Sequence, residues 1–396
     1  MELLETLFSA EAANLQRSVM RELVQLMARP GIISLAGGLP ASEHLPTQQL
    51  RECYNAVLEH ENGDALQYRP RYHPLLEWIA GYMQSRGVPC DAEQILITNG
   101  NQQGLTLMSR LFLEPGQVAV IEAATFTGVQ QTTAGRGANI RTVPVDLATG
   151  VDTRALEAAF HQEPRPHLAV LIPDFHNPLG VTLTASKRVR AAALAGQYGV
   201  PLVEDDPYSL LRFSGEMLPP VKAYDEAGFV FYLGSFSKML APGLRLGWIV
   251  APPGLTTRLR VLRESIDLET SALTQRAVAE FLRRGLLEPH LERLNAANRE
   301  RCAAMLVALD QHLGDIANWT EPEGGLFVWM TLPPQIDTWA MFEQALAENV
   351  AYIPGAAFTV DGSQRNSLRL NFSKVGPDDI AEGIRRLAGV IHRALE

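Results

Sequence analysis

The chain has 396 residues, of which 46% are hydrophobic and 20% are charged, and its formal net charge at pH 7 is -10. This length favours two domains, and an acidic balance without any basic run argues against nucleic acid as a partner. The three cysteines lie far apart with no metal or disulfide spacing, so we expect no metal site. Because there is no signal-peptide pattern and no apolar run of about 18 residues, we expect a cytoplasmic protein without a membrane partner.

The N-terminal part of the chain predicts one helix followed by a loop. In residues 16–29, Val19, Leu23 and Met27 recur at helical spacing, and a Pro-Gly pair ends the helix. The glycines and prolines of residues 31–46 predict a loop.

From about residue 94, short apolar runs alternate with helical patterns. Strands separated by helices indicate a parallel α/β sheet that helices cover on both faces. Beyond about residue 255, long helices and a mixed tail predict a smaller α+β unit. The expected strands of the parallel sheet are residues 94–98, 117–123, 141–145, 167–173, 201–205, 229–235 and 244–252.

Polar side chains follow several of these strands, at the sheet edge where open α/β folds bind ligands. Taken singly, each has another explanation: Asn101 can cap a helix, Asn177 can form a turn, and Arg245 can pair with a surface carboxylate. Because separate strand ends contribute them to one rim, we expect a common site. The residues concerned are Asn101, Gln102, Asn177, Asp205, Tyr208, Ser235, Ser237, Lys238 and Arg245.

These side chains match one chemical requirement. A helix N-terminus, two serine hydroxyls and an arginine fork hold a small dianion, and Lys238 beside them can form a Schiff base. The Asp205 carboxylate would face a cation, while Asn177 and Tyr208 can both donate to an oxyanion. Pyridoxal 5'-phosphate (PLP) carries all four partners: a phosphate, an aldehyde, a pyridinium nitrogen and a phenolate oxygen. The pattern therefore predicts PLP as the cofactor.

Three motifs carry a family resemblance: "SFSK" followed by "PGLRLGW" within residues 235–248, "EDDPY" at 204–208 and "HNPLG" at 176–180. From about residue 15 to the C-terminus, the chain resembles the class I/II aminotransferases of PLP fold type I, closest to the 2-aminoadipate, kynurenine and aromatic branch. The resemblance implies an α/β fold with a mainly parallel sheet sandwiched by helices. It places an N-terminal helix and loop near the active site at residues 1–45, a large PLP-binding domain at 46–285 and a small α+β domain at 286–396.

The resemblance also implies roles within the site. Lys238 resembles the Schiff-base lysine, Asp205 the partner of the pyridinium nitrogen, and Asn177 and Tyr208 the pair on the phenolate oxygen. Phe126 stands where relatives usually have a tyrosine that stacks on the ring. The implied phosphate ligands are Ser235, Ser237 and Arg245, with the backbone and side chains of Gln102 and Asn101, the latter in place of a more usual serine or glycine.

On the substrate side, Arg369 of "LRLNFS" matches the arginine that binds the α-carboxylate, with Gly38 and Asn177 beside the substrate. Tyr68 of "LQYRP" resembles the tyrosine that reaches the phosphate of a neighbouring subunit, which implies a homodimer with shared active sites.

Ser18 and Arg21 lie three residues apart, on one face of the expected N-terminal helix. The resemblance implies that this helix forms a lid, in which Arg21 pairs with the distal carboxylate of glutamate or 2-aminoadipate, assisted by Ser18. The alternative is a surface arginine that pairs with a glutamate.

The expected activity is an aminotransferase that moves an amino group from an L-amino acid to a 2-oxo acid, with 2-oxoglutarate as acceptor. Candidate donors are 2-aminoadipate, glutamate, and aromatic or branched-chain amino acids. Two alternatives stay open: another PLP reaction such as a C–S lyase, and a non-catalytic PLP-type ligand-sensing domain. Regulators of the second kind carry a DNA-binding module, which the roughly 15 residues before the matched region are too few to form.

Overall fold

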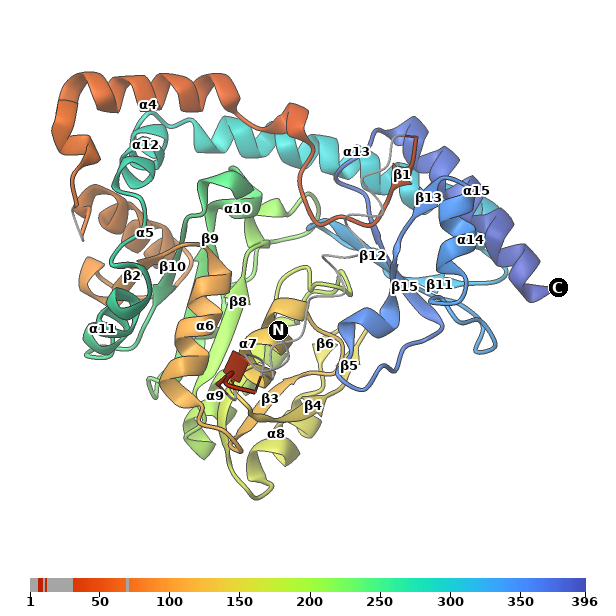
Figure 1. Ribbon diagram of the computed structural model, residues 1–396, viewed down its shortest axis with the longest axis horizontal. Helices are drawn as coiled ribbons and strands as arrows, with labels where there is room; N and C mark the ends of the chain where they lie inside the picture. Colours follow the sequence, from red (N-terminus) through yellow and green to blue (C-terminus); the bar gives the residue numbers. More distant parts are fainter. Residues whose placement is uncertain (1–5, 10, 13–30, 69–70) are drawn as a thin grey trace.

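The structure of the chain is a computed structural model, shown in Figure 1, that describes residues 6–9, 11–12, 31–68 and 71–396. The expected helix at residues 16–29, with Ser18 and Arg21, lies outside these residues. Across the described ranges, no helix combines the length and hydrophobicity needed to cross a membrane.

The larger sheet has seven strands and is mainly parallel. Within it, only β10 runs against its neighbours, pairing antiparallel with β9 and β2, so the predicted α/β sheet is confirmed with one reversed strand. Residues 236–246 join β9 to β10, and a parallel partner needs a longer crossover of a dozen or more residues. In spatial order the strands are β2 (Ile95–Thr98), β10 (Gly247–Val250), β9 (Val230–Ser235), β8 (Leu202–Asp206), β7 (Pro166–Leu171), β3 (Val118–Glu122) and β4 (Asn139–Val143).

Helices cover both faces of this sheet. Val120 of β3 packs in one cluster with residues of α8 (Thr153–His161) and α9 (Ala185–Tyr198). Its neighbours Ala119 and Ile121 pack in another cluster, with residues of α6 (Asn101–Phe112). Because neighbouring residues of a strand point to opposite faces, the two clusters lie on the two sides of the sheet. This double cover explains why the strands appear in the sequence as continuous apolar runs.

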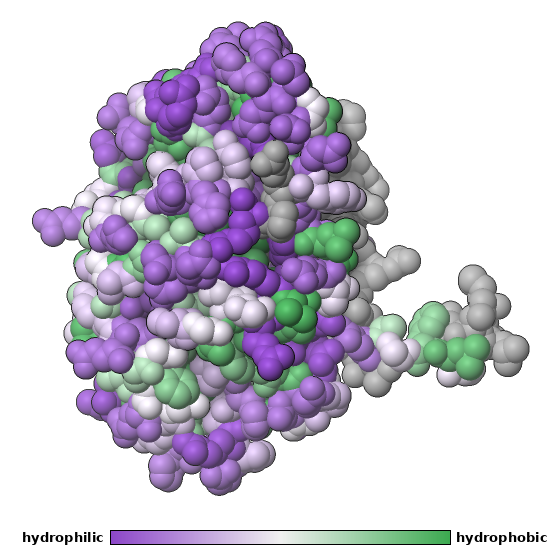
Figure 2. Space-filling model, turned by 90° about the vertical axis from the view of Figure 1, so that its left-hand side faces the viewer, coloured by the Kyte–Doolittle hydropathy of each residue, from purple (hydrophilic) through white to green (hydrophobic). Residues whose placement is uncertain are grey.

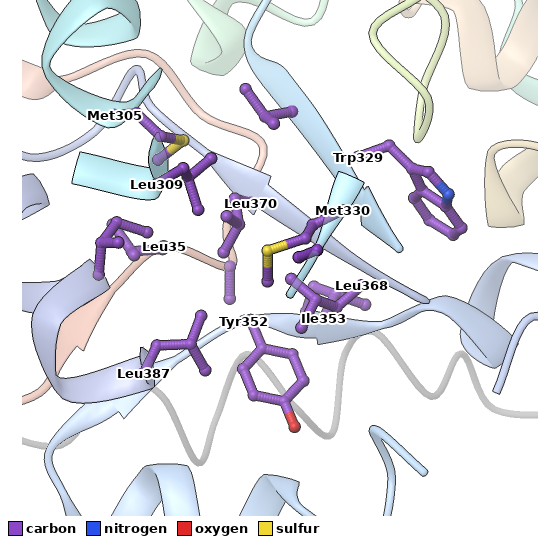
Figure 3. Close-up of a cluster of buried hydrophobic side chains, with 14 of the residues drawn as sticks. Leu35, Met305, Leu309, Trp329, Met330, Tyr352, Ile353, Leu368, Leu370 and Leu387 are labelled. Atoms are coloured by element: carbon purple, nitrogen blue, oxygen red, sulfur yellow. The ribbon is translucent and has the colours of Figure 1, made fainter. Parts of the chain in front are cut away.

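A second, antiparallel sheet of four strands lies in the C-terminal part of the chain. Figure 3 shows Met330 and Leu370 of this sheet packed with Met305 and Leu309 of α13 and with Leu387 of α15. The domain boundaries at residues 45 and 285 stay a prediction. The elements are β11 (Asn318–Trp319), β12 (Phe327–Thr331), β15 (Ser367–Asn371), β14 (Ile353–Pro354), α13 (Leu287–Leu313) and α15 (Pro377–Leu395).

Residues 31–46 are not entirely the loop that the sequence predicted. β1 (Ile33–Ser34) pairs in parallel with β13 (Val350–Ala351), and Leu35 N donates to Ala351 O over 2.8 Å. A strand of two residues is too short to produce a periodic pattern. The pairing fixes the segment that leads to Gly38.

The remaining helices lie around the larger sheet and beside the smaller one. α12 packs on α4 and α5, on the left-hand side of Figure 1. Figure 2 turns this side to the viewer and shows hydrophobic residues among hydrophilic ones. The helices concerned are α4 (Thr47–Glu61), α5 (His73–Ser85), α7 (Thr127–Ala134), α10 (Phe236–Met239), α11 (Thr256–Asp267), α12 (Ala272–Arg283) and α14 (Phe342–Ala347).

Candidate active site

A cavity of about 320 Å³ lies at the carboxyl ends of the parallel strands. Asp205, the last but one residue of β8, and Ser235, the last residue of β9, form part of its wall. The structure thus brings together most of the side chains that the sequence singled out. Those that line the cavity are Gly38, Asn101, Gln102, Phe126, Asn177, Asp205, Tyr208, Ser235, Ser237, Lys238, Arg245 and Arg369.

Lys238 reaches the cavity from α10, the short helix directly after β9. Its Nζ donates a hydrogen bond to the carbonyl oxygen of Gly38 over 2.7 Å. Burial, together with the positive charges of Arg369 and Arg245, lowers the pKa of Lys238 to about 8. More of the amine is therefore uncharged and nucleophilic near neutral pH than in an exposed lysine.

A group of anion-binding side chains forms one end of the cavity. Ser235 Oγ accepts a hydrogen bond from Ser237 N over 3.0 Å and so caps α10. Arg245 has a positive φ of 50°, and its Nη2 donates to Asn99 O over 2.8 Å. Gly100 permits this approach, because a Cβ there would lie 2.8 Å from Arg245 Nη2. Two hydroxyls, a guanidinium and the N-terminus of α6 together suit a phosphate dianion.

Asp205 has a buried carboxylate that contacts the first turn of α6. Asn101 Nδ2 donates to Asp205 Oδ1 over 2.6 Å and to Leu233 O over 3.3 Å. The Asn101 side chain, expected from the resemblance to bind phosphate, is directed to this carboxylate instead. Burial raises the pKa of Asp205 to about 7, with Asp206 and Glu122 adding to the rise and the Asn101 hydrogen bond opposing it. A cation beside the carboxylate would favour its ionised form.

Asp206 anchors the turn that follows β8. Its Oδ1 accepts from Ser209 N over 2.9 Å and from Tyr208 N over 3.3 Å. Its Oδ2 accepts from Arg86 Nη1 over 3.0 Å and from Tyr232 Oη over 2.8 Å. The sequence did not point to Arg86, which lies far from the motifs and meets them only in the folded chain.

A chain of hydrogen bonds joins Arg369, Asn177 and Tyr208. Asn177 Nδ2 donates to Tyr208 Oη over 3.3 Å, and Arg369 Nη1 donates to Asn177 Oδ1 over 2.7 Å. Burial raises the pKa of Tyr208 above its ordinary value, so the phenol keeps its proton at neutral pH. Burial also lowers the pKa of Arg369 to about 9. Asn177 is therefore the link between a phenol and a guanidinium that both face the cavity.

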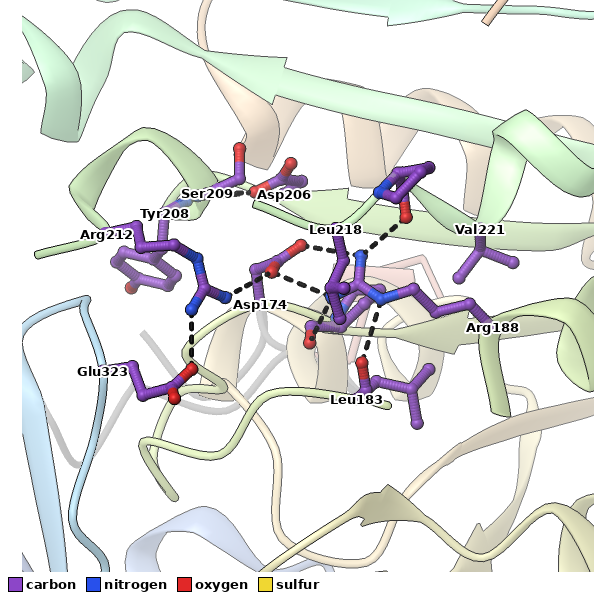
Figure 4. Close-up of polar contacts among 12 residues, drawn as sticks. Asp174, Leu183, Arg188, Asp206, Tyr208, Ser209, Arg212, Leu218, Val221 and Glu323 are labelled. Atoms are coloured by element: carbon purple, nitrogen blue, oxygen red, sulfur yellow. Dashed lines mark hydrogen bonds and ion pairs between the residues drawn. The ribbon is translucent and has the colours of Figure 1, made fainter. Parts of the chain in front are cut away.

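The segment that carries Asn177 is fixed by a buried ionic network, drawn in Figure 4. Arg188 donates from Nη1 and Nη2 to the two carboxylate oxygens of Asp174, over 2.9 and 2.8 Å. Arg212 lies 3.8 Å from Asp174 Oδ1 and donates to Glu323 over 2.6 Å. Bidentate pairing in a buried setting holds Asp174, and with it the backbone three residues before Asn177.

The family model described as "Aminotransferase class I and II" matches residues 30–387. The chain belongs to this family of aminotransferases. It is 40% identical to aromatic-amino-acid aminotransferase 1 of Thermococcus litoralis, over 99% of this chain and 95% of the relative. The chain also resembles the solved structure of kynurenine aminotransferase of Pyrococcus horikoshii in complex with PMP, with a TM-score of 0.94 and 38% sequence identity. The superposition covers 99% of this chain and 98% of that one. α-Aminoadipate aminotransferase of Thermus thermophilus, complexed with N-(5'-phosphopyridoxyl)-L-leucine, has a TM-score of 0.91 at 38% identity, with 99% of each chain covered.

These comparisons confirm the predicted family, fold and cofactor: the protein is a PLP-dependent aminotransferase of fold type I. The cavity of this aminotransferase fits PLP, because it offers an amine, an anion-binding end, a buried carboxylate and two donors for an oxyanion. Asn101 Oδ1 is a further buried acceptor for which the described residues provide no donor.

Among the residues expected in the aminotransferase site, Tyr68 does not line the cavity of its own chain. Tyr68 is 77% exposed, and Ser18 and Arg21 lie outside the described residues. The sequence motifs did not point to several other lining residues, none of which has an ionisable side chain. Two of them are chain neighbours of predicted site residues: Leu39 follows Gly38, and Pro207 precedes Tyr208. This adjacency would have been enough to predict that they line the cavity. The missed residues are Leu39, Ile172, Pro207, Pro242 and Phe327.

Proposed function

We propose that this aminotransferase takes the amino group of an aromatic, branched-chain or acidic L-amino acid and passes it to a 2-oxo acid, with 2-oxoglutarate as the acceptor. The observation that carries the proposal is that Lys238 and Arg369 line one cavity. Arg369 makes no ion pair with a described carboxylate, and its two terminal nitrogens each donate one hydrogen bond to a neutral acceptor, which leaves its charge and further N–H donors for a substrate. An amino acid brings an amine to the lysine and a carboxylate to the arginine.

The chain's own groups would hold PLP at each of its polar positions. Ser235, Ser237, Arg245 and the N-terminus of α6 would hold the phosphate, Asp205 the ring nitrogen, and Asn177 and Tyr208 the phenolate oxygen. PLP, when bound through Lys238, supplies an electron-accepting ring that stabilises negative charge at the substrate Cα. Burial raises the pKa of Asp205, and a pyridinium beside it would favour the ionised carboxylate.

Lys238 would also move the proton of the reaction. With a pKa lowered to about 8, its Nζ is partly uncharged at neutral pH and accepts the Cα proton of the substrate. Arg369 would bind the α-carboxylate through two parallel N–H donors and so orient the Cα–H bond. Lysine in its place would lack this fork.

The lining of the cavity supports amino acids with apolar or aromatic side chains as substrates. Leu39, Ile172, Phe126 and Phe327 provide apolar walls. The cations of the described lining are Lys238, Arg245 and Arg369, and each already has a proposed partner. We therefore assign the distal carboxylate of 2-aminoadipate, glutamate or 2-oxoglutarate to Arg21, assisted by Ser18. The relatives are named for aromatic amino acids, kynurenine and α-aminoadipate, which supports this dual range.

A homodimer with shared active sites is part of the proposal. Tyr68, Leu66 and Leu268 are large side chains that are more than half exposed, and a second subunit would bury apolar surface if it covered them. Tyr68 would then complete the phosphate site of the neighbouring subunit. We place the enzyme in the cytoplasm, in keeping with Cys53, Cys90 and Cys302 as free, buried thiols.

The test is a substrate screen in two halves. Each L-amino acid is added alone to the PLP-loaded enzyme, and the loss of the PLP absorbance band and the oxo acid formed are measured. 2-Oxoglutarate is then added, and it should restore the band and yield glutamate. Release of ammonia, sulfide or pyruvate from a sulfur amino acid without any acceptor would instead establish the C–S lyase reaction.

A further inference from the structure

Arg369 is a buried cation that has no carboxylate partner among the described residues. The side chain is 2% exposed and donates to two neutral acceptors, Asn177 Oδ1 over 2.7 Å and Ala36 O over 2.6 Å. Its Nε is buried, and no acceptor for it lies in the described part of the chain. Burial of a charge without a counter-charge is unfavourable, so other groups must stabilise the guanidinium while no substrate is bound.

Two phenyl rings lie against this guanidinium. Arg369 Cζ is 4.1 Å from the ring centroid of Phe327 and 4.8 Å from that of Phe358. Both distances are within the range of about 6 Å over which the negative face of an aromatic ring attracts a cation. Both rings are almost completely buried, so water screens the attraction little.

The two rings come from different parts of the C-terminal region. In the β12–β15 pair, Trp329 lies opposite Arg369, and Phe327 stands two residues before Trp329 on the same face of the sheet. Phe358 ends a 3-10 turn at residues Gly355–Phe358 that follows β14. The register of the strands and the position of this turn therefore decide the contact.

We propose that Phe327 and Phe358 are positioning residues that keep the Arg369 guanidinium charged and in one fixed plane, ready for a single carboxylate. The rings attract the guanidinium through their negative faces and use none of its N–H donors, so those that Asn177 and Ala36 do not accept from stay available. A carboxylate partner from the protein would occupy those same donors and compete with the substrate. The inference rests on the proposed role of Arg369 in binding the substrate carboxylate.

Phe358 is the residue that allows a clean test. Phe327 lines the cavity, and a Cβ on Gly38 would lie 3.2 Å from its ring, so its replacement would change the shape of the substrate site. Phe358 is not among the lining residues of the cavity and contacts Trp329 edge-on at a centroid distance of 6.2 Å. Phe358→Leu therefore removes one ring from Arg369 while it leaves the cavity wall in place.

The experiment compares two ligands with the same phenylpropyl skeleton, one ending in a carboxylate and the other in a neutral alcohol. Dissociation constants of 3-phenylpropanoate and 3-phenylpropan-1-ol for the PLP-loaded enzyme are measured by calorimetry. In Phe358→Leu we expect about tenfold weaker binding of the carboxylate, which corresponds to about 1.4 kcal/mol, and less than a twofold change for the alcohol. With the best amino acid substrate, KM should rise while kcat stays within about twofold.

Two further variants separate electrostatics from packing. A fluorinated phenylalanine placed at position 358 keeps the shape of the ring but weakens the negative charge of its face, so it should weaken carboxylate binding in the same direction. Phe342→Leu is the matched control, because Phe342 belongs to the same core cluster but stacks edge-on with Trp339 and Tyr352. It should lower stability and leave both dissociation constants unchanged.

The outcomes distinguish this inference from the proposed function. If Arg369→Lys binds 3-phenylpropanoate as well as the unmodified enzyme does, the role of Arg369 itself is wrong. If Arg369→Lys weakens binding but neither change at position 358 does, the role of the two rings is wrong. Equal losses for the carboxylate and the alcohol, or equal effects of Phe358→Leu and Phe342→Leu, would likewise overturn the inference, because they would indicate general loosening of the core.

Discussion

Asn101 Nδ2 donates a hydrogen bond to Asp205 Oδ1 over 2.6 Å, and this bond joins the first turn of α6 to the end of β8. A serine or a glycine at this position would lack the amide. The bond lowers the pKa of Asp205 against the larger, opposite effect of burial. Asn101 therefore supports the charge of the carboxylate that we assign to the cofactor ring.

Replacement of Asn101 by serine should weaken PLP binding about tenfold, because the Asp205 carboxylate loses a donor and its pKa rises further. Equilibrium dialysis of PLP against the apoenzyme measures the change directly. Asn99→Ser is the matched control, since the Asn99 side chain contacts Asp267 instead of Asp205. An unchanged PLP affinity in Asn101→Ser would show that the bond is not used when the cofactor is present.

The apoenzyme should lose stability as the pH rises from about 4 to about 7. The pKa of Asp205 rises from its ordinary value of 3.8 to about 7, so between these values the folded chain binds more protons than the unfolded chain. The free energy of unfolding then falls with pH, by roughly 4 kcal/mol at most from this one group. Asp205→Asn should remove this fall.

The free energy of unfolding is measured in urea at several pH values for the unmodified apoenzyme and for the Asp205→Asn apoenzyme. The difference between the two free energies at each pH gives the contribution of Asp205. A difference that is flat across this range would contradict the raised pKa. In the PLP-loaded enzyme the fall should disappear, because a pyridinium beside Asp205 favours the ionised carboxylate.

Lys238 should be the residue that bonds covalently to PLP. Borohydride treatment of the loaded enzyme, followed by mass analysis of peptides, should find the cofactor fixed on Lys238. Lys238→Ala should still bind PLP, without fixation, and should lose turnover by several orders of magnitude because it lacks the proton carrier. Turnover close to that of the unmodified enzyme would refute the assignment.

The reactivity of Lys238 in the apoenzyme should follow an apparent pKa of about 8, which acylation rates as a function of pH would report. Arg369→Gln should shift this value upward, since the positive charge of Arg369 lowers the pKa of Lys238. A downward shift would mean that the two cations do not interact as the structure places them.

Tyr68→Phe should leave a homodimer but speed the loss of PLP by a few-fold, because the hydroxyl no longer reaches the phosphate of the neighbouring subunit. Sedimentation velocity gives the oligomeric state, and the rate of PLP release in dilute solution gives the effect. A fully active monomer would rule out shared active sites.

Arg21→Gln should lower kcat/KM for 2-aminoadipate and 2-oxoglutarate by about thirtyfold or more, with little effect on leucine. Loss of one partner of a desolvated charge pair costs roughly 2–5 kcal/mol, and an apolar substrate has no such pair to lose. Equal losses on acidic and apolar substrates would show that Arg21 only supports the fold.

The order of residue types along the chain was enough to predict the parallel α/β sheet and most of the residues that line the cavity. Most of the buried strands are apolar runs, and Asp205, Ser235 and Lys238 lie at the end of a strand or within three residues after it. Because parallel strands present their carboxyl ends at one edge, residues that share this local position meet in space. Local order along the chain was therefore sufficient to predict that these side chains converge.

Which of these groups contact one another depends on how distant elements pack in the folded chain. Asn101 and Asp205 are separated by 104 positions, and a helix start gives no sign of the carboxylate that it will meet. The rings of Phe327 and Phe358 reach Arg369 through the register of β12 with β15 and through a turn after β14. The spacing of buried apolar residues along a strand is the same whether they pack in a core or lie against a cation, because this spacing reflects only that they are buried. Their partners depend on how separate elements pack, which no local spacing records.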